Sequence, residues 1–251
     1  MFNKDIEFSA HEDYFVLKED YPTPIKLNIP EWFKKLEHSV LDKTVKGCMP
    51  FLDSLTSGYL LKIPQDFHVR HNVDIKNEKG EEKKDSFQTF GLHEASQLLY
   101  AKSINLNSGL NTHPTKQVEG SYFIEKNKNL PFYKILNPWK IKTPKGYSCL
   151  FVPPLNNSDD RFSIIPGIVD TDSFPIEINF PIIINGDKYP ILETTIKKGT
   201  PYVQIIPFKR DNWKMSIKPK KQKEIQNSKL FYGLRVLNVY KDKYWNKKLF
   251  K

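Results

Sequence analysis

The second half of the chain is a series of short apolar runs, each broken by proline, glycine or asparagine. The runs have the lengths of β-strands and cover residues 134–143, 146–155, 176–184, 189–196 and 202–208. Turn sequences such as Pro-Lys-Gly, Asn-Gly-Asp and Lys-Lys-Gly separate them. Short strands with frequent turns are typical of a closed or two-sheet β architecture and argue against βαβ units. The pattern therefore predicts a mainly β core.

The first half mixes strand and helix patterns. Residues 66–75 alternate between apolar and polar side chains, as a half-buried strand does, and residues 25–27 also resemble a strand. Pro30 suits the start of a short helix over residues 31–38, because the N–H that proline lacks is not needed in the first turn. Residues 47–64 predict a turn, a short helical segment and then a strand, whereas the polar residues 102–119 predict a long loop.

The C-terminal segment changes from a strand period to a helical one. Spacings of three and four predict a helix there, although an internal glycine costs about 1 kcal/mol relative to alanine. The residues at these spacings are Leu230, Leu234, Leu237, Lys241 and Tyr244, and Trp245 and Leu249 extend their apolar face. We expect the Leu234, Leu237 and Tyr244 side to dock and the lysines to face outward.

These patterns divide the chain into three parts. We predict an N-terminal extension over residues 1–45, a β core over residues 46–218 and a basic helical tail over residues 219–251. At 251 residues, with 39% hydrophobic and 13% aromatic content, the chain is long and apolar enough for a buried core.

Composition also bears on whether the protein is secreted, spans a membrane or contains disulfides. No apolar run approaches the roughly 18 residues of a membrane-spanning helix, and the first residues lack the apolar stretch of a signal peptide. Cys48 and Cys149 form neither a disulfide framework nor a zinc-binding spacing. We therefore expect a reduced protein that is not secreted and not transmembrane, without a membrane partner.

The positive charge is concentrated at the C-terminus. The chain has a net charge of +10, while residues 209–251 alone carry +11, so the preceding residues are nearly neutral. Such a tail suits an anionic partner, which includes nucleic acid and acidic virion proteins. A solvated lysine-rich helix explains the same composition, and the sequence leaves both interpretations open.

Two segments carry a recognisable motif. Residues 166–172 have the sequence PGIVDTD, and about thirty residues later GTPYVQ opens another apolar strand. This order resembles the dUTP pyrophosphatase and dCTP deaminase superfamily, in which a G-[IV]-[IV]-D turn precedes a strand that contains glutamine. The resemblance implies a β-clip core, a homotrimer with pockets between subunits, and a nucleotide ligand.

The same resemblance assigns roles to single residues. Asp170 matches the aspartate that orients the attacking water, and Gly167 and Ile168 belong to its turn. The segment that follows contacts the base and sugar, which makes Asp172 and Phe174 further ligand-binding candidates. Gln204 matches the glutamine of the last core strand. No cofactor is expected, except that Mg²⁺ would accompany nucleotide hydrolysis.

The chain also departs from this family. The Arg-Ser-Ser phosphate grip is replaced by residues 156–160, Asn-Asn-Ser-Asp-Asp, whose two carboxylates would repel a triphosphate. The glycine-rich C-terminal arm of the family is replaced by the lysine-rich tail. Without a phosphate grip, Asp170 and Asp172 are also explained as turn-capping residues on a β scaffold.

At a finer level, several pieces of residues 50–213 resemble a functionally uncharacterised family of phage and bacterial proteins. These pieces are PFLDSLTSGYLLKIP, NPWKIKTPKGYSCLFVPPLN, PGIVDTD, INFP and GTPYVQIIPFKRDNW. The resemblance implies a phage protein in the host cytoplasm or the virion. The leading hypothesis is a non-enzymatic accessory protein, either a virion component or a nucleotide-binding or sequestering module.

Two alternatives belong to other functional classes. One is an active nucleotide pyrophosphatase or deaminase that uses Asp170, and the other is nucleic-acid binding through the basic tail. Arg210, beside Lys209 and close to Trp213, is a candidate to bind phosphate or to stack on a base. The same cluster would also serve to cap the edge of a sheet.

Overall fold

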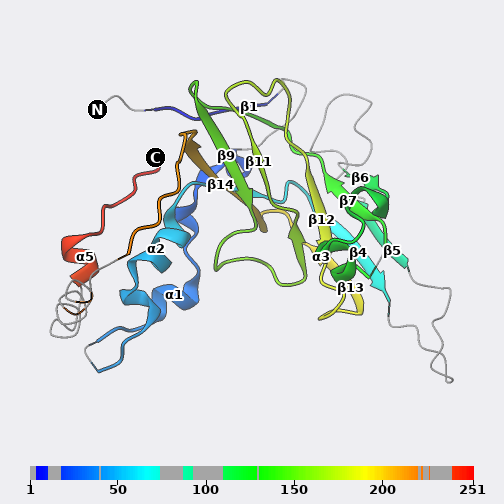
Figure 1. Ribbon diagram of the computed structural model, residues 1–251. Helices are drawn as coiled ribbons and strands as arrows, with labels where there is room; N and C mark the ends of the chain where they lie inside the picture. Colours follow the sequence, from blue (N-terminus) through cyan, green and yellow to red (C-terminus); the bar gives the residue numbers. More distant parts are fainter. Residues whose placement is uncertain are drawn as a thin grey trace. The chain divides into compact units, whose positions relative to one another are not determined.

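The structure is a computed structural model of the chain, and it is mainly β (Figure 1). It describes residues 4–10, 18–39, 41–73, 87–92, 110–128, 130–219, 222, 226 and 239–251. Contacts within the chain form two compact units. Unit 1 comprises Met1–Thr23 and Gly58–Lys209, and unit 2 comprises Pro24–Ser57 and Arg210–Lys251. The predicted boundaries after residues 45 and 218 stay a prediction, as does the finer β-clip assignment.

The largest sheet of unit 1 has five strands in the order β11-β9-β14-β3-β2. Its members are β11 (Gly167–Val169), β9 (Tyr147–Val152), β14 (Pro201–Lys209), β3 (Tyr59–Lys62) and the short β2 (Thr23–Pro24). β14 pairs antiparallel with β9 on one side and with β3 on the other. Both edges of this nine-residue strand are therefore hydrogen-bonded, and β11 lies at one edge of the sheet.

Smaller antiparallel sheets complete unit 1. The four-stranded sheet has the order β10 (Phe162–Ile164), β12 (Phe180–Ile184), β7 (Phe132–Ile135) and β6 (Leu110–His113). The three-stranded sheet has the order β13 (Ile191–Ile196), β4 (Phe67–Asn72) and β5 (Phe87–Leu92). The two-stranded sheet pairs β1 (Glu7–Ala10) with β8 (Trp139–Lys142). One buried cluster draws side chains from all four sheets, so unit 1 has a common core.

Strand β12 is buried on both of its faces within this single chain. Ile182 and Ile184 belong to the main cluster, whereas Ile183 packs with Ile124 and Phe132 in a second cluster. Ile124 comes from α3 (Tyr122–Lys126), which contacts β12. An apolar run such as residues 180–184 is therefore explained by burial under a helix, without a neighbouring subunit.

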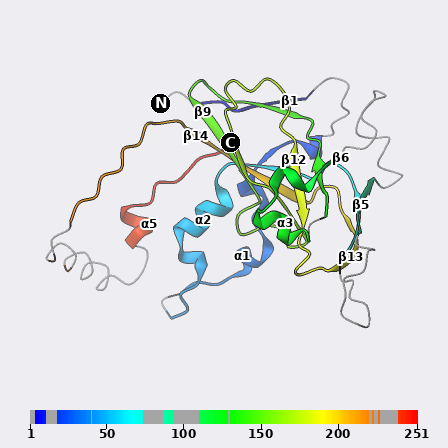
Figure 2. The ribbon, with the colours of Figure 1, turned by 45° about the vertical axis from the view of Figure 1, so that its right-hand side comes forward.

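The regular elements of unit 2 are short helices, which come from both of its sequence segments. They are η2 (Ile25–Asn28), α1 (Glu31–Lys35), η3 (Val45–Gly47), α2 (Met49–Thr56) and α5 (Val239–Lys243). Phe33 stacks on Phe51 with ring centroids 5.8 Å apart, and Trp32 meets both rings edge-on. Residues 210–219 follow β14 as a long segment without regular structure (Figure 2).

The C-terminal residues are attached to α2 by one carboxylate. Trp245 donates its indole N–H to both carboxylate oxygens of Asp53, at 3.0 and 3.1 Å, and Lys248 forms an ion pair with the same group at 2.5 Å. The tail therefore docks through Trp245, whereas Tyr244 is half exposed. Leu234 and Leu237 lie outside the described residues.

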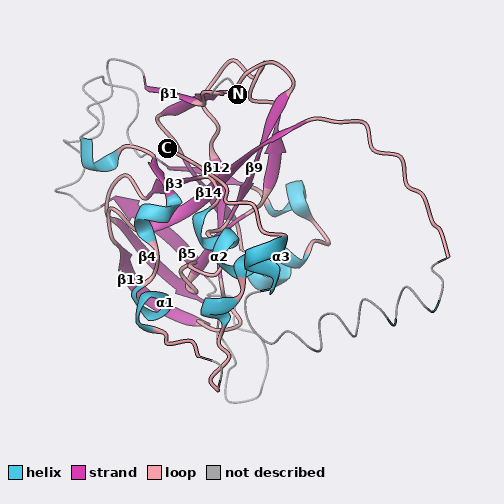
Figure 3. Ribbon diagram, turned by 90° about the vertical axis from the view of Figure 1, so that its left-hand side faces the viewer, coloured by secondary structure: helices cyan, strands magenta, loops and turns pink. Residues whose placement is uncertain are grey.

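Most sequence predictions of strands are confirmed, including β4, β9, β12, β13 and β14 (Figure 3). The predicted strand at residues 25–27 is wrong, because these residues form η2. The predicted helix to the C-terminus is also wrong in part, since α5 ends at Lys243 and residues 245–251 are irregular. The loop predicted at residues 102–119 contains β6 and η5 (Thr115–Val118). A further short element is η1 (Lys18–Asp20).

No described helix combines the length and the apolar character needed to cross a membrane.

Gly58, just before β3, lies very close to the backbone of β14. Its φ is +88°, and a Cβ at this position would lie 2.0 Å from the carbonyl oxygen of Ile205 in β14. Gly146 has a similar φ of +85° but an open surrounding. Gly146→Ala should therefore cost only the left-handed backbone strain of about 1–2 kcal/mol. Gly58→Ala should cost about 1–3 kcal/mol more, because backbone atoms must also move.

Urea denaturation of both variants and the parent chain measures these costs. Equal losses for Gly58→Ala and Gly146→Ala would show that β3 and β14 can separate without strain.

Candidate functional site

The turn that follows β11 holds the predicted catalytic carboxylate. Val169 pairs with Cys149 of β9, and Asp170 is the next residue along. The fully buried Ser148 donates its hydroxyl hydrogen to Asp170 Oδ1 at 2.6 Å. The backbone N–H groups of Ser173 and Phe174 donate to the carbonyl oxygen of Asp170 at 3.1 and 3.0 Å. Asp170 therefore lies on a turn at the end of a strand, and both its side chain and its carbonyl stabilise that turn. Gly167 and Ile168, which the sequence placed in the turn, belong to strand β11.

The next carboxylate has a similar structural role. Asp172 Oδ2 accepts a hydrogen bond from the backbone N–H of Gly146 at 2.8 Å, which connects this turn to the β8–β9 turn. Beneath them, the hydroxyl groups of Thr143 and Thr171 lie 2.7 Å apart. Thr171 also donates to the sulfur of Cys149 at 3.3 Å. Burial raises the pKa of the Cys149 thiol to about 11, so this thiol stays protonated near neutral pH.

Gln204 lies at a different position along the sheet. It pairs with Val152 at the far end of β9, four positions from Ser148, which corresponds to roughly 13 Å along a strand. The side chain is fully buried, and its Oε1 accepts a hydrogen bond from the backbone N–H of Leu155 at 2.8 Å. The structure therefore does not bring the Gln204 amide next to Asp170.

The remaining predicted site residues are at the surface. Gly167 is exposed, Ile168 is 63% exposed, and Phe174 is 37% exposed on the turn after Asp170. Ile168, Leu150 and Ile206 form one row across β11, β9 and β14, and Leu150 and Ile206 are only half-buried. Arg210 is exposed and begins the second segment of unit 2.

The two carboxylates predicted to repel phosphate are neutralised by neighbours. Arg161 Nε donates to Asp159 Oδ1 at 3.0 Å and Nη2 donates to Oδ2 at 2.6 Å, while Nη1 donates to Thr194. This contact with Asp159 raises the pKa of Arg161. Asp160 pairs with Lys188 and accepts a hydrogen bond from Tyr189, and these contacts, Lys188 first, lower the pKa of Asp160.

The pocket beside these ion pairs has a volume of about 320 Å³ and includes Ser158, Asp159, Asp160 and Lys126 in its wall. Each of the two carboxylates therefore has its own cation, and the repulsion of a triphosphate stays a prediction. The arrangement is a framework of ion pairs that holds the β9–β10 connection, which sequence spacing did not reveal.

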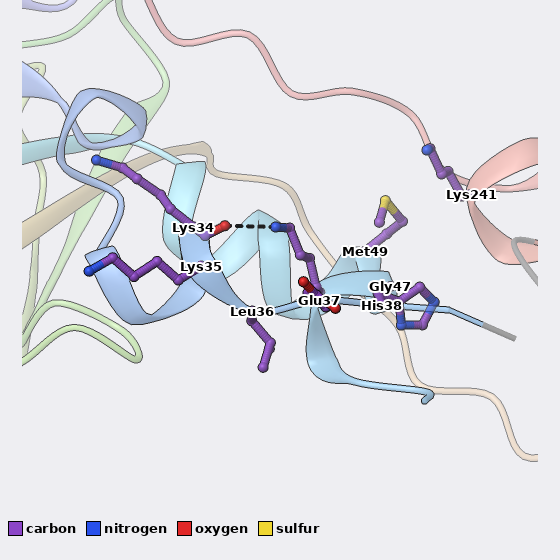
Figure 4. Close-up of a pocket in the computed structure, with 9 residues that line it drawn as sticks. Lys34, Lys35, Leu36, Glu37, His38, Gly47, Met49 and Lys241 are labelled. Atoms are coloured by element: carbon purple, nitrogen blue, oxygen red, sulfur yellow. Dashed lines mark hydrogen bonds between the residues drawn. The ribbon is translucent and has the colours of Figure 1, made fainter. Parts of the chain in front are cut away.

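Unit 2 contains a larger and more basic pocket, of about 660 Å³ (Figure 4). Its wall carries four lysines and one glutamate, a formal charge of +3 with histidine neutral. The lining residues are Lys34, Lys35, Leu36, Glu37, His38, Lys46, Gly47, Met49 and Lys241. The pocket therefore combines residues around α1 and η3 with a lysine from α5. We call it the basic pocket.

Backbone contacts fix the walls of the basic pocket. Lys46 donates its ammonium hydrogen to the carbonyl oxygen of Lys34 at 2.8 Å, as Figure 4 shows. The backbone N–H of Thr44 donates to His38 Nδ1 at 3.0 Å. A Cβ on Gly47 would lie 2.2 Å from His38 Nε2, so only glycine allows the ring to lie against the chain there.

The lysines of the basic pocket differ in whether they already form an ion pair within the protein. Lys34 pairs with Glu31 at 2.5 Å, whereas none of the ion pairs between described residues involves Lys35 or Lys241. Figure 4 shows Lys34 and Lys35 extending to one side of the pocket, with the Lys241 ammonium on the opposite side. The charges therefore line an extended surface and do not converge on one point.

The sequence predicted a basic tail but not this pocket. Its only local sign was the clustering of lysines in FKKLEH and DKTVKG. Among the described residues, no group of three or more His, Cys, Asp or Glu side chains is placed to hold a metal ion.

Comparison of the chain with family models finds no match, and comparison with curated proteins also finds none.

The two thiols should differ strongly in reactivity. Cys48 is exposed, whereas Cys149 is buried with a raised pKa, and the thiolate is the reactive form. We expect Ellman's reagent at pH 8 to titrate one thiol per folded chain quickly and the second only after denaturation. Cys48→Ser should remove the fast phase. A fast phase that persists in Cys48→Ser would show that the turn above Cys149 opens in the native protein.

Proposed function

We propose that the protein is a non-enzymatic phage accessory protein on a dUTP pyrophosphatase-like β scaffold, and that it binds an anionic polymer through the basic pocket. The single observation that carries the binding proposal is the basic pocket itself, with its net positive wall and with Lys35 and Lys241, which form no ion pair with another described residue. We propose a nucleic acid as this polymer, because its regularly spaced phosphates can pair with lysines that lie along an extended surface. The phage setting, in the host cytoplasm or the virion, rests on the sequence resemblance.

Charge distribution supports the choice of unit 2 as the binding unit. Unit 2 carries a formal charge of +11, so unit 1 is close to neutral. A polyanion that approaches the protein is therefore attracted by unit 2, and the attraction is long-range at low salt. The β scaffold of unit 1 contributes little to this attraction.

The hydrogen bonds of the Asp170 turn support the non-enzymatic part of the proposal. A general base must reach the water it activates. The Asp170 carboxylate accepts a hydrogen bond from Ser148, its carbonyl closes the turn, and Gln204 is satisfied by Leu155. These contacts match the turn-capping interpretation of Asp170. A nucleotide pyrophosphatase or deaminase that uses Asp170 with Mg²⁺ is the alternative.

We expect no enzymatic hydrolysis of dUTP or dCTP. The full-length protein is incubated with each nucleotide and Mg²⁺, and the release of pyrophosphate and, from dCTP, of ammonia is compared with that of Asp170→Asn. The expected rate equals the buffer rate for both proteins. A Mg²⁺-dependent release that Asp170→Asn abolishes would establish the hydrolase alternative.

Binding to DNA should depend on the basic pocket and on salt. We expect full-length protein to bind duplex DNA of 20 base pairs at low salt, with a log–log salt slope near −0.9 per neutralised phosphate. Charge reversal at both Lys35 and Lys241 should weaken binding at least tenfold and make the slope shallower by about 2, because two phosphate contacts are lost. Fluorescence anisotropy at two salt concentrations measures both effects.

The matched control reverses two exposed lysines of unit 1, Lys142→Glu with Lys145→Glu, which changes the net charge equally. We expect the control to reduce binding much less than the pocket variant. Equal losses would assign binding to net charge alone, and the absence of binding at low salt would refute the polyanion proposal.

A further inference from the structure

Residues 210–219, which we call the arm, expose apolar side chains to an unusual degree. Trp213 is 91% exposed, Met215 is 84% exposed and Ile217 is 85% exposed. The arm has no regular structure and follows an extended course in Figures 2 and 3. Large exposed side chains in a row are uncommon in soluble proteins unless a partner covers them.

The arm has the residue pattern of a half-buried strand. Trp213, Met215 and Ile217 alternate with Lys214, Ser216 and Lys218, so an extended backbone places the apolar and basic side chains on opposite sides. Such a segment binds most readily to the edge of a sheet, where main-chain hydrogen bonds and alternate side-chain contacts form together.

Unit 1 offers an edge with matching properties. Among the described strands, β11 pairs only with β9, and it is the last strand of its sheet. Ile168 on β11 is 63% exposed, and the segment after it exposes Phe174 and Ile176 at 37% and 58%. Apolar side chains are thus exposed on β11 and on the segment that follows it, as they are along the arm.

The charges of the arm and of this edge are complementary. The arm carries a formal charge of +2, whereas residues 166–178 contain three carboxylates and no lysine or arginine. The carboxylates belong to Asp170, Asp172 and Glu177. Opposite charges on the two segments favour their association and select its partner.

We propose that the arm of one copy adds as a strand to the β11 edge of a second copy. Met215 and Ile217 favour this partner over single-stranded nucleic acid, since aliphatic side chains offer no aromatic face on which bases stack. A head-to-tail contact of this kind closes a ring when copies repeat it. The inference does not rest on the basic pocket, because neither Lys35 nor Lys241 belongs to the arm.

The first test compares the masses of full-length variants at micromolar concentration by light scattering. We expect the parent chain to have a multiple of the 29.4 kDa chain mass, and the triple variant Trp213→Ser, Met215→Ser and Ile217→Ser to have the mass of one chain. Lys214→Ser with Lys218→Ser changes the opposite side of the arm and removes charge complementarity alone, so it should weaken the assembly less than the triple variant does. All these side chains are exposed, so replacing them removes no core packing. The thermal midpoint of each single chain should therefore stay the same.

The second test changes the proposed receptor. Ile168→Asp on β11 should also yield single chains, whereas Ile191→Asp on β13, an equally exposed position at 64%, should leave the mass unchanged. Mixing the arm variant with Ile168→Asp should restore one productive contact, between the intact arm of one chain and the intact β11 edge of the other. The expected product is a complex of two chains.

Three results would overturn the proposal. The first is a parent protein with the mass of one chain, and the second is an unchanged mass in the triple arm variant. The third is a mixture of the two defective variants that remains fully as single chains. If the parent is a single chain and Trp213→Ser abolishes its binding to a single-stranded DNA oligomer, the arm is instead a base-stacking segment.

Discussion

Strand β14 holds unit 1 together because both of its edges are hydrogen-bonded. One edge pairs with β9 over six residues, and the other pairs with β3, with a shift in register after Pro201. Its residues Val203 and Ile205 are fully buried in the common core. The position of β9 then fixes β11, and β11 fixes the turn that contains Asp170. The chemistry of that turn therefore follows from the register of a strand far from it in sequence.

The Asp170 turn illustrates why a motif alone does not establish a catalytic site. A carboxylate that ends a strand is suited to activating water, and it is equally suited to closing a turn. Here, the distinction comes from its neighbours. Ser148 and the backbone of Ser173 and Phe174 hydrogen-bond to Asp170, and Gly146 hydrogen-bonds to Asp172.

The two units differ in the kind of surface they offer. Unit 1 pairs some of its charged side chains internally, such as Asp159 with Arg161 and Asp160 with Lys188. Unit 2 holds an excess of lysine and uses few carboxylates, among them Asp53, to attach its C-terminal residues. This excess of lysine is the charge on which the proposed binding of a polyanion rests.

The sequence by itself determined the mainly β character, the positions of most strands in the second half and the concentration of charge at the C-terminus. Period-two alternation and turn residues are local properties, so they can be recognised without knowing any contact. Only the tertiary structure decided that residues 25–27 form a 3₁₀-helix, that Gln204 is separated from Asp170 along β9, and that Lys35 and Lys241 line one pocket. These features depend on register and on contacts between segments distant in sequence, such as Gln204 with Leu155, which local patterns do not specify.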